Sequence, residues 1–226
     1  MPRQRRTVKS PEPAGGTEME CSFSDCRDRL TPGNAATNFP NPSLSVRRAV
    51  EGRIVGRGST ILEVGSGNLR NARYIRARLD GTRYDVFELE EVQERFKEQY
   101  ESFRNGGGRV LTADLGRRHY DFVICTFVLE TVCPAVRRDE LLAQIRSRLR
   151  PGGALIASIR GVPGVRGARY TKCPAGEGFV TPLRTFVRPY SIREARRLLT
   201  AGGFEEVKAL QRYRVEAPEN IHLLAS

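Results

Sequence analysis

Apolar residues gather in five short runs along the chain, and segments with a different apolar spacing lie around them. A short apolar run bounded by turn residues is typical of a buried strand. The runs predict strands at Thr60–Val64, Tyr84–Glu88, Arg109–Leu115, Tyr120–Thr126 and Ala154–Ile159. The run at 120–126 is largely apolar on both faces, as a central strand of a parallel sheet requires.

Five segments before, between and after these runs carry apolar residues at every third or fourth position, which is the spacing of a helix with one buried face. The spacing predicts helices at 43–55, 68–79, 90–104, 137–150 and 191–201. Ser43 is expected to cap the first of them, and Ser191 with Glu194 forms a capping box at the start of the last. Strands that alternate with helices predict an α/β fold around a mostly parallel sheet.

The first predicted strand stops at Gly65-Ser66-Gly67 and gives way to a helix. Glycine adopts backbone angles closed to other residues and lets a ligand approach the main chain, while a helix start leaves N–H groups unpaired. The second and third strands end in acids, Glu88 and Asp114, and a carboxylate there can accept hydrogen bonds from a ribose diol. The pattern therefore predicts a nucleotide-type pocket at the carboxyl ends of the strands.

A Gly-x-Gly turn after a strand also occurs in nicotinamide dinucleotide sites. Those sites need a third glycine, here at position 70, so that helix and strand pack closely around a pyrophosphate. Arg70 stands at that position. We therefore rank a dehydrogenase below an enzyme whose cofactor has no pyrophosphate.

Taken in order, these features resemble the class I S-adenosylmethionine-dependent methyltransferases over residues 43–226. The matching features are Glu63-x-Gly65-x-Gly67, Glu88, Asp114-Leu115, Tyr120-Asp121-Phe122-Val123-Ile124, and Leu149-Arg150-Pro151-Gly152-Gly153 before a strand. The chain departs from the family at Leu69, where many members have a third glycine. The resemblance implies S-adenosylmethionine as cofactor. It also implies a doubly wound, mostly parallel seven-stranded sheet with an antiparallel last strand, in which 204–213 and 220–225 form the final antiparallel pair.

The same resemblance implies the roles of individual residues. Glu63 and the glycine turn would hold the methionine end of the cofactor, Glu88 the ribose hydroxyls, and Asp114 with Leu115 the adenine edge. The whole expected cofactor-binding set is Glu63, Gly65, Ser66, Gly67, Glu88, Asp114, Leu115, Cys125 and Thr126. If the acceptor carries a proton, a base must lie within about 3 Å of it, and the candidates are Glu130, His119 and Tyr190.

The segment 161–189 is rich in Gly and Pro and long for a connection in a compact domain, which is typical of a functional or mobile insert. Between residues 151 and 193 the chain has seven bases and one acid, so this stretch carries half of the net charge of +12. Aromatic residues interleave with the bases, as where arginine grips anionic groups and rings stack. An exposed basic loop anchored by aromatic residues would have the same composition. The expected substrate-side residues are Phe39, Asn41, Tyr170, Arg184, Arg188 and Tyr190.

The 226 residues suit one domain, which we place at 31–226 after a polar tail at 1–30 without sustained periodicity. The pI near 10.1 favours acidic partners, although nearly all of the positive charge is arginine. Five cysteines, an odd number, favour reduced thiols over a disulfide framework. Cys21 and Cys26 have no second Cys or His pair nearby in sequence, so we expect no metal site.

The chain has no window of about 20 apolar residues, the length that a membrane helix needs, and no apolar segment after its basic start. We therefore expect a cytoplasmic protein without membrane contact. The leading hypothesis is a methyltransferase acting on a small molecule. The alternatives are an RNA or other nucleic-acid methyltransferase that uses the basic 160–193 segment, and a catalytically inactive S-adenosylmethionine-binding module.

Overall fold

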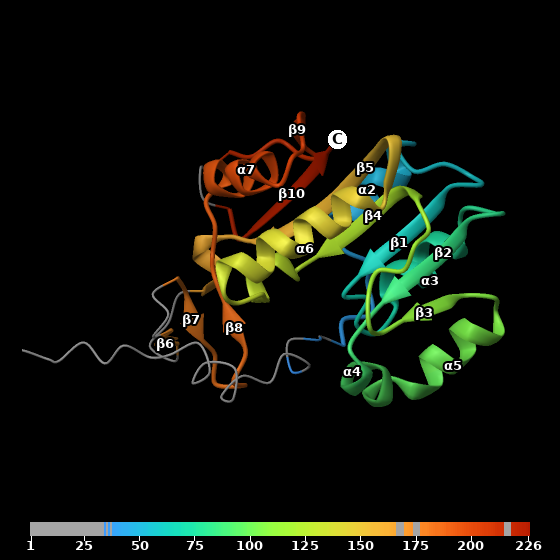
Figure 1. Cartoon of the computed structure of the whole chain (residues 1–226), viewed down its shortest axis with the longest axis horizontal. Coiled ribbons are helices and arrows are strands. Elements are labelled where there is room, and N and C mark those ends of the chain that lie inside the picture. Colours follow the sequence, from blue (N-terminus) through green and yellow to red (C-terminus); the bar gives the residue numbers. More distant parts are fainter. Residues whose placement is uncertain (1–33, 35, 37, 166–169, 174–176, 215–217) are drawn as a thin grey trace, which may run out of the picture.

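The computed structural model describes residues 34, 36, 38–165, 170–173, 177–214 and 218–226, so the predicted tail at 1–30 lies outside it. The main sheet consists of β1 Thr60–Val64, β2 Arg83–Phe87, β3 Arg109–Leu111, β4 Tyr120–Thr126, β5 Leu149–Arg160, β9 Val207–Ala209 and β10 Asn220–Ala225. Their order across the sheet is β3-β2-β1-β4-β5-β10-β9 (Figure 1). Strand β10 is antiparallel to both neighbours and the other pairs are parallel, which confirms the predicted sheet.

Helices cover both faces of this sheet (Figure 1). They are α2 Leu44–Glu51, α3 Arg70–Arg76, α4 Glu90–Arg95, α5 Lys97–Asn105, α6 Ala135–Ser147 and α7 Ile192–Ala201. On one face Leu142 of α6 and Leu199 of α7 belong to the same buried cluster as Leu62. On the other face, residues of α2 to α5 pack in a second cluster around Ile61 and Val86. The two clusters bury the apolar runs that predicted the strands.

The side chains of β1 alternate between these two clusters. Leu62 and Val64 enter the cluster beneath α6 and α7, whereas Ile61 enters the cluster beneath α2 to α5. Because successive side chains of a strand point to opposite faces, Glu63 shares the face of Ile61. The only acid of β1 therefore lies on the side of α3.

Several elements differ from their predicted bounds. Strand β3 ends at Leu111, so that Asp114 and Leu115 lie in the connection that follows it. The helix expected at 90–104 is divided at Phe96, whose φ of −115° and ψ of 36° are not helical. Ser43 precedes α2, but its side chain makes no capping hydrogen bond; instead its backbone N–H is donated to Asn71 Oδ1.

The insert at 161–189 contains a small sheet that its Gly- and Pro-rich sequence did not predict. Strands β6 Thr171–Lys172, β7 Phe179–Val180 and β8 Phe186–Val187 pair antiparallel in that order. Two 3₁₀ helices, η2 Leu129–Thr131 and η3 Val162–Val165, follow β4 and β5. The buried Arg138 of α6 bonds to Tyr190 and to Glu177, which fixes the insert against the core.

Within the part of the chain that the structure describes, every helix is too short or too polar to span a bilayer.

Candidate functional site

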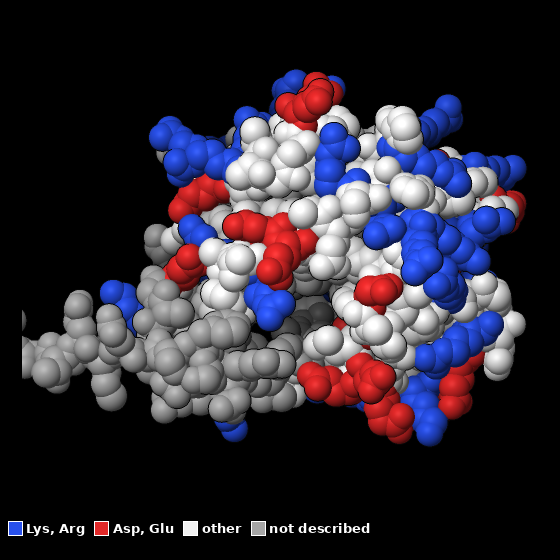
Figure 2. Space-filling model, viewed as in Figure 1, with Lys and Arg blue, Asp and Glu red and all other residues white. Residues whose placement is uncertain are grey.

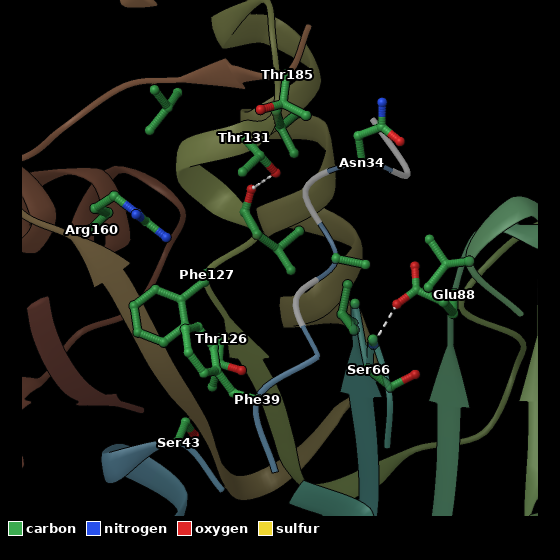
Figure 3. A pocket seen from close by; sticks show the side chains of 18 of the residues that line it. Asn34, Phe39, Ser43, Ser66, Glu88, Thr126, Phe127, Thr131, Arg160 and Thr185 are labelled. Carbon is green, nitrogen blue, oxygen red and sulfur yellow. Dashed lines mark hydrogen bonds between the residues drawn. The ribbon is translucent and has the colours of Figure 1, made fainter. Parts of the chain in front are cut away.

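A cavity of about 1230 Å³ opens at the carboxyl ends of β1, β2 and β4 (Figure 3). Its walls come from the glycine turn after β1, the end of β2, the residues after β4, the insert, and the segment before α2. In open α/β sheets this edge is where ligands bind. Eight of the predicted residues line the cavity: Glu63, Gly65, Ser66, Gly67, Glu88, Thr126, Phe39 and Tyr170.

The turn after β1 requires glycine at its first position. Gly65 has a φ of +72° and Gly67 a φ of +54°, in the left-handed region that favours glycine. A Cβ atom on Gly65 would lie 2.2 Å from Cγ2 of Val128, so a side chain there meets the wall opposite. Tyr100 of α5 holds the turn from behind, since its hydroxyl donates to the Gly67 carbonyl and lies 2.8 Å from Ser66 Oγ.

Leu69, which follows the glycine turn, has a left-handed backbone although it carries a side chain. Its φ is +62°, and it is the residue that precedes α3. A left-handed conformation costs an L-residue about 1–2 kcal/mol. The Leu69 side chain is 1% exposed in the cluster beneath α2 to α5, and burial of a leucine stabilises by about 1.5–3 kcal/mol. Burial of the side chain can therefore offset the backbone strain.

Glu88 follows β2 directly and meets the glycine turn. Its Oε2 accepts a hydrogen bond from the Gly67 amide at 2.6 Å, and its Oε1 accepts one from the Leu89 amide at 2.9 Å. Burial raises the pKa of Glu88 above its ordinary value, while these two amides lower it. The carboxylate is thus held at the cavity wall in one orientation (Figure 3).

Glu63 and Asn71 join the floor of the cavity into one hydrogen-bonded unit. Glu63 accepts hydrogen bonds from Asn71 Nδ2 at 2.7 Å and from the Tyr84 hydroxyl at 2.9 Å. Burial raises the pKa of Glu63 to about 7, although both bonds lower it. Asn71 Nδ2 also reaches Thr126 Oγ1 at 3.3 Å, and Asn71 Oδ1 accepts from the Ser43 amide at 2.8 Å. Asn71 therefore links α2, β1 and β4, a role that the sequence analysis missed.

The segment before α2 lies over the glycine turn and reaches the insert. Asn68 Nδ2 donates to Asn38 Oδ1 at 3.1 Å and to the Phe39 carbonyl at 3.0 Å. Asn34 Nδ2 donates to the Leu183 carbonyl of the insert at 3.1 Å. Phe39 is 62% exposed and lines the cavity, whereas the predicted Asn41 does not line it.

Phe127, which follows β4, and His222 of β10 also line the cavity, and neither is among the predicted site residues. Phe127 has a φ of +61°, a strained value for a residue with a side chain, and its ring lies edge-on to His222 with centroids 6.4 Å apart. His222 Nδ1 lies 2.9 Å from Ser158 Oγ, which in turn lies 2.6 Å from Ser45 Oγ. Burial lowers the pKa of His222 to about 4, so that its ring is neutral near pH 7.

Three predicted cofactor residues do not line the cavity. Asp114 is exposed, and its carboxylate accepts a hydrogen bond from the Gly116 amide at 2.6 Å in its own turn. Leu115 and Cys125 are buried in the core beneath α6 and α7. Burial raises the pKa of the Cys125 thiol far above its ordinary value. The carboxylate of Glu88 therefore meets the glycine turn as expected, whereas the role of Asp114 stays a prediction.

Of the basic and aromatic residues expected in the insert, Tyr170 lines the cavity and packs edge-on to Phe179 with centroids 6.5 Å apart. Arg184, Arg188 and Tyr190 do not line it. Arg188 Nη1 lies 3.6 Å from Glu177, and the Tyr190 hydroxyl accepts from Arg138 Nη1 at 2.8 Å. Arg188 and Tyr190 therefore help to hold the insert in place.

The three predicted bases occupy different environments. His119 is exposed before the first residue of β4, at the end of the strand opposite to the cavity. Tyr190 is buried and bonded to Arg138. Glu130 is 1% exposed, and neither of its carboxylate oxygens has a hydrogen-bond partner among the described residues. Burial raises the pKa of Glu130 to about 7, while the nearby Arg160 lowers it.

On the face shown in Figure 2, Lys and Arg side chains gather on the side of β1 to β3, and acids gather near α4 and α5. A nucleic-acid acceptor therefore stays a prediction from composition. Among the described residues, no three His, Cys, Asp or Glu side chains are arranged to hold a metal ion.

Comparisons with known proteins agree with this architecture. Residues 62–155, from β1 to β5, match a family model described as a methyltransferase domain. No curated protein matches the chain in sequence. Among solved structures, the CcbJ methyltransferase from Streptomyces caelestis is 16% identical with a TM-score of 0.66, over 88% of this chain and 98% of that one.

Two further structures have ligands named with them. The 1,6-didemethyltoxoflavin-N1-methyltransferase from Burkholderia thailandensis, with its substrate and S-adenosylhomocysteine bound, is 19% identical over 80% of this chain and 77% of that one, with a TM-score of 0.57. Human N-acetylserotonin methyltransferase in complex with S-adenosylmethionine is 16% identical, also with a TM-score of 0.57. The match covers 80% of this chain and 51% of the human one. At these identities the likeness shows the fold that the three enzymes share with this chain.

Proposed function

We propose that this chain transfers a methyl group from S-adenosylmethionine to a small-molecule acceptor, because residues 62–155 match a methyltransferase domain and the chain shares its fold with solved methyltransferases. The observation that carries the proposal is the meeting of Glu88 with the Gly67 amide at 2.6 Å, at the carboxyl edge of the sheet. A fixed carboxylate beside an open glycine turn offers both an acceptor for hydroxyl groups and a close approach to the main chain.

The residues present fit that cofactor. Each Glu88 oxygen accepts one backbone amide and keeps a lone pair that can accept from a ribose hydroxyl. Gly65 provides a cradle that a Cβ atom would close. Glu63 and Asn71 form the wall beneath the turn. We leave Asp114, Leu115 and Cys125 out of the proposed set because they do not line the cavity.

When bound, S-adenosylmethionine supplies an electrophilic methyl group on a positively charged sulfur. The chain has to align the acceptor with that methyl group and exclude water, and alignment alone can supply much of the rate acceleration. Thr126, the last residue of β4, and Phe127 and Val128, which follow it, form the wall where we place the acceptor. Asn34 closes one side, because it joins the segment before α2 to the insert at Leu183.

An acceptor that releases a proton needs a base that reaches the cavity. His222 lines the cavity and is neutral near pH 7, because burial lowers its pKa to about 4. If Nδ1 donates to Ser158, Nε2 is left to accept a proton. Glu130 has the higher pKa, about 7, but does not line the cavity. We therefore propose His222 as the proton acceptor, ahead of Glu130.

The size of the cavity and the neighbours support a small acceptor. Ligand pockets usually measure about 300–1000 Å³, so a cavity of about 1230 Å³ has room for a cofactor and a second small molecule. The names of two structural neighbours specify small molecules, 1,6-didemethyltoxoflavin and N-acetylserotonin. A cytoplasmic location is part of the proposal, because five cysteines, an odd number, favour reduced thiols over a disulfide framework.

Two measurements test the proposal. Isothermal titration with S-adenosylmethionine should show one binding site per chain. Absence of binding would refute the proposed methyltransferase activity. Methyl-labelled cofactor incubated with the protein and a cell extract should then label the small-molecule fraction. If the label appears in RNA instead, the acceptor is a nucleic acid and the proposed small-molecule acceptor is refuted. Binding without any transfer would indicate the inactive binding module.

A further inference from the structure

Arg160, the last residue of β5, places a positive charge in the cavity and forms no ion pair with any described acid. It is partly buried and lines the cavity (Figure 3). Within the described parts of the chain, its guanidinium makes no hydrogen bond and no ion pair. A guanidinium has five N–H donors, and partly buried donors without partners cost free energy that a ligand can recover. The Arg160 guanidinium is therefore suited to donate hydrogen bonds to a ligand in the cavity.

Other arginines near the insert are paired. Arg138 Nη2 bonds to Glu177 at 3.0 Å, and Arg188 Nη1 lies 3.6 Å from the same carboxylate. Two acids lie in the region of Arg160, Glu130 and Glu219, and neither is within the 4.0 Å of an ion pair. Glu219 is exposed on the cavity rim. The charge of Arg160 is thus available to a bound molecule.

The register of the sheet places Arg160 beside the expected acceptor. Thr126 of β4 pairs with Ser158 of β5, and β5 continues for two more residues to Arg160. Side chains two apart in a strand share a face, so Arg160 lies on the same side as Ser158 and its partner His222. The Arg160 guanidinium carbon lies 6.0 Å from the centroid of the Phe127 ring. A positive charge, an aromatic face and a neutral imidazole therefore adjoin one part of the cavity.

We propose that the methyl acceptor is an aromatic molecule that bears a carboxylate, and that Arg160 binds this carboxylate while the ring packs against Phe127. This inference rests on the proposed function and adds the chemical class of the acceptor. A planar carboxylate matches the guanidinium fork with two parallel hydrogen bonds, which a lysine or a neutral donor would not reproduce. The ring of Phe127 favours an aromatic partner through offset or edge-on stacking.

The carboxylate of the cofactor's own methionine end is the rival ligand for Arg160. Arg70 is better placed for that carboxylate. It opens α3 directly after the glycine turn and also lines the cavity. Arg160 lies across the sheet, at the end of β5. Loss of Arg160 should therefore weaken acceptor binding and spare cofactor binding.

The test uses benzoate and benzamide, which share a ring and differ in charge, with the full-length protein saturated with S-adenosylhomocysteine. Ligand-observed NMR titration should show that benzoate binds at least tenfold more tightly than benzamide. In Arg160→Gln the preference should fall to about one, with the affinity for S-adenosylhomocysteine unchanged within twofold. Arg83→Gln is the matched control, since Arg83 is exposed at the start of β2, the end of that strand far from Glu88. This variant should keep the preference.

Three outcomes would overturn the inference alone. The first is a wild-type protein that binds S-adenosylhomocysteine but shows no preference for benzoate. The second is a preference that persists in Arg160→Gln, and the third is a tenfold loss of affinity for S-adenosylhomocysteine in Arg160→Gln. The last result would assign Arg160 to the cofactor. A wild-type protein that binds no S-adenosylhomocysteine would instead refute the proposed function, and the acceptor class would fall with it.

Discussion

The carboxylate of Glu88 accepts the backbone amide of Gly67 at 2.6 Å, although 20 residues and a whole helix separate them in sequence. The contact exists because β1 and β2 are adjacent and parallel, so that Val64 pairs with Phe87 and both strands end at the same edge. An acid placed directly after β2 then faces the turn that follows β1. Parallel pairing of consecutive strands is therefore what assembles this part of the site.

Replacing Glu88 by Gln should weaken S-adenosylmethionine binding at least tenfold, or by about 1.4 kcal/mol. The amide keeps the shape but loses the charge that strengthens hydrogen bonds from hydroxyl groups. Isothermal titration measures the change. Glu98→Gln on the exposed face of α5 removes the same charge away from the cavity and should bind like the wild type. Equal affinities for the Glu88 and Glu98 variants would exclude Glu88 from the cofactor site.

Gly65→Ala should both destabilise the domain and impair cofactor binding. The alanine would adopt a φ of +72°, which costs about 1–2 kcal/mol, and its Cβ would lie 2.2 Å from Val128 Cγ2. Overpacking of this kind adds about 1–3 kcal/mol. Urea denaturation should therefore show a loss of about 2–5 kcal/mol.

The double variant Gly65→Ala with Val128→Ala separates the two causes. Removing the Val128 methyl groups relieves the contact but leaves the backbone strain, so part of the stability should return. The two substitutions should thus be less than additive, as expected for residues in contact. Additive losses would mean that the contact with Val128 does not cause the stability loss of Gly65→Ala.

The capping box of α7 gives a prediction about stability alone. Ser191 Oγ accepts from the Glu194 amide at 3.2 Å, and Glu194 Oε2 accepts from the Ser191 amide at 2.8 Å. Ser191→Ala should lower the free energy of unfolding by about 1 kcal/mol in thermal or urea denaturation. Ser102→Ala, at an exposed position inside α5, removes a hydroxyl without a capping role and should change stability little. A similar loss in both variants would argue against the cap.

The sequence predicted those elements whose apolar pattern coincides with their burial in the sheet. The apolar runs at 60–64 and 120–126 have the bounds of β1 and β4, and Glu88 was identifiable because it comes directly after such a run. The run at 109–115 was misleading because apolar composition alone does not determine where a strand stops. Strand β3 pairs only as far as Leu111 opposite Phe87, so Asp114 falls in an exposed turn.

The acceptor side of the cavity could not be read from the sequence, because its residues meet only through pairings between distant segments. His222 reaches the cavity since β10 pairs with β5 in the register that sets His222 opposite Ser158. Composition identified the basic segment but not which of its arginines are paired. Glu177 engages Arg138 and Arg188, which leaves Arg160 facing the cavity. The ion pairs of Glu177 form only when the insert packs against α6, so composition alone could not reveal them.

Glu130→Gln should change how stability depends on pH. In the folded chain, burial raises the pKa of Glu130 from 4.5 to about 7, so the native state holds a proton that the unfolded state has released between these two values. The contribution of Glu130 to the free energy of unfolding is therefore highest below about pH 4.5 and is lost as pH rises to about 7. A shift of this size corresponds to about 3 kcal/mol. Glutamine cannot ionise, so the variant should lack this loss.

The measurement is the free energy of unfolding of both proteins at pH 5 and pH 8. Relative to the wild type, Glu130→Gln should gain up to about 3 kcal/mol between these two conditions. Glu63, whose pKa is also raised by burial to about 7, contributes to both proteins and cancels in the comparison. Glu51→Gln, at an exposed position of α2, should follow the wild-type curve. Parallel curves for Glu130→Gln and the wild type would mean that the Glu130 carboxylate ionises in the folded chain as readily as in the unfolded one.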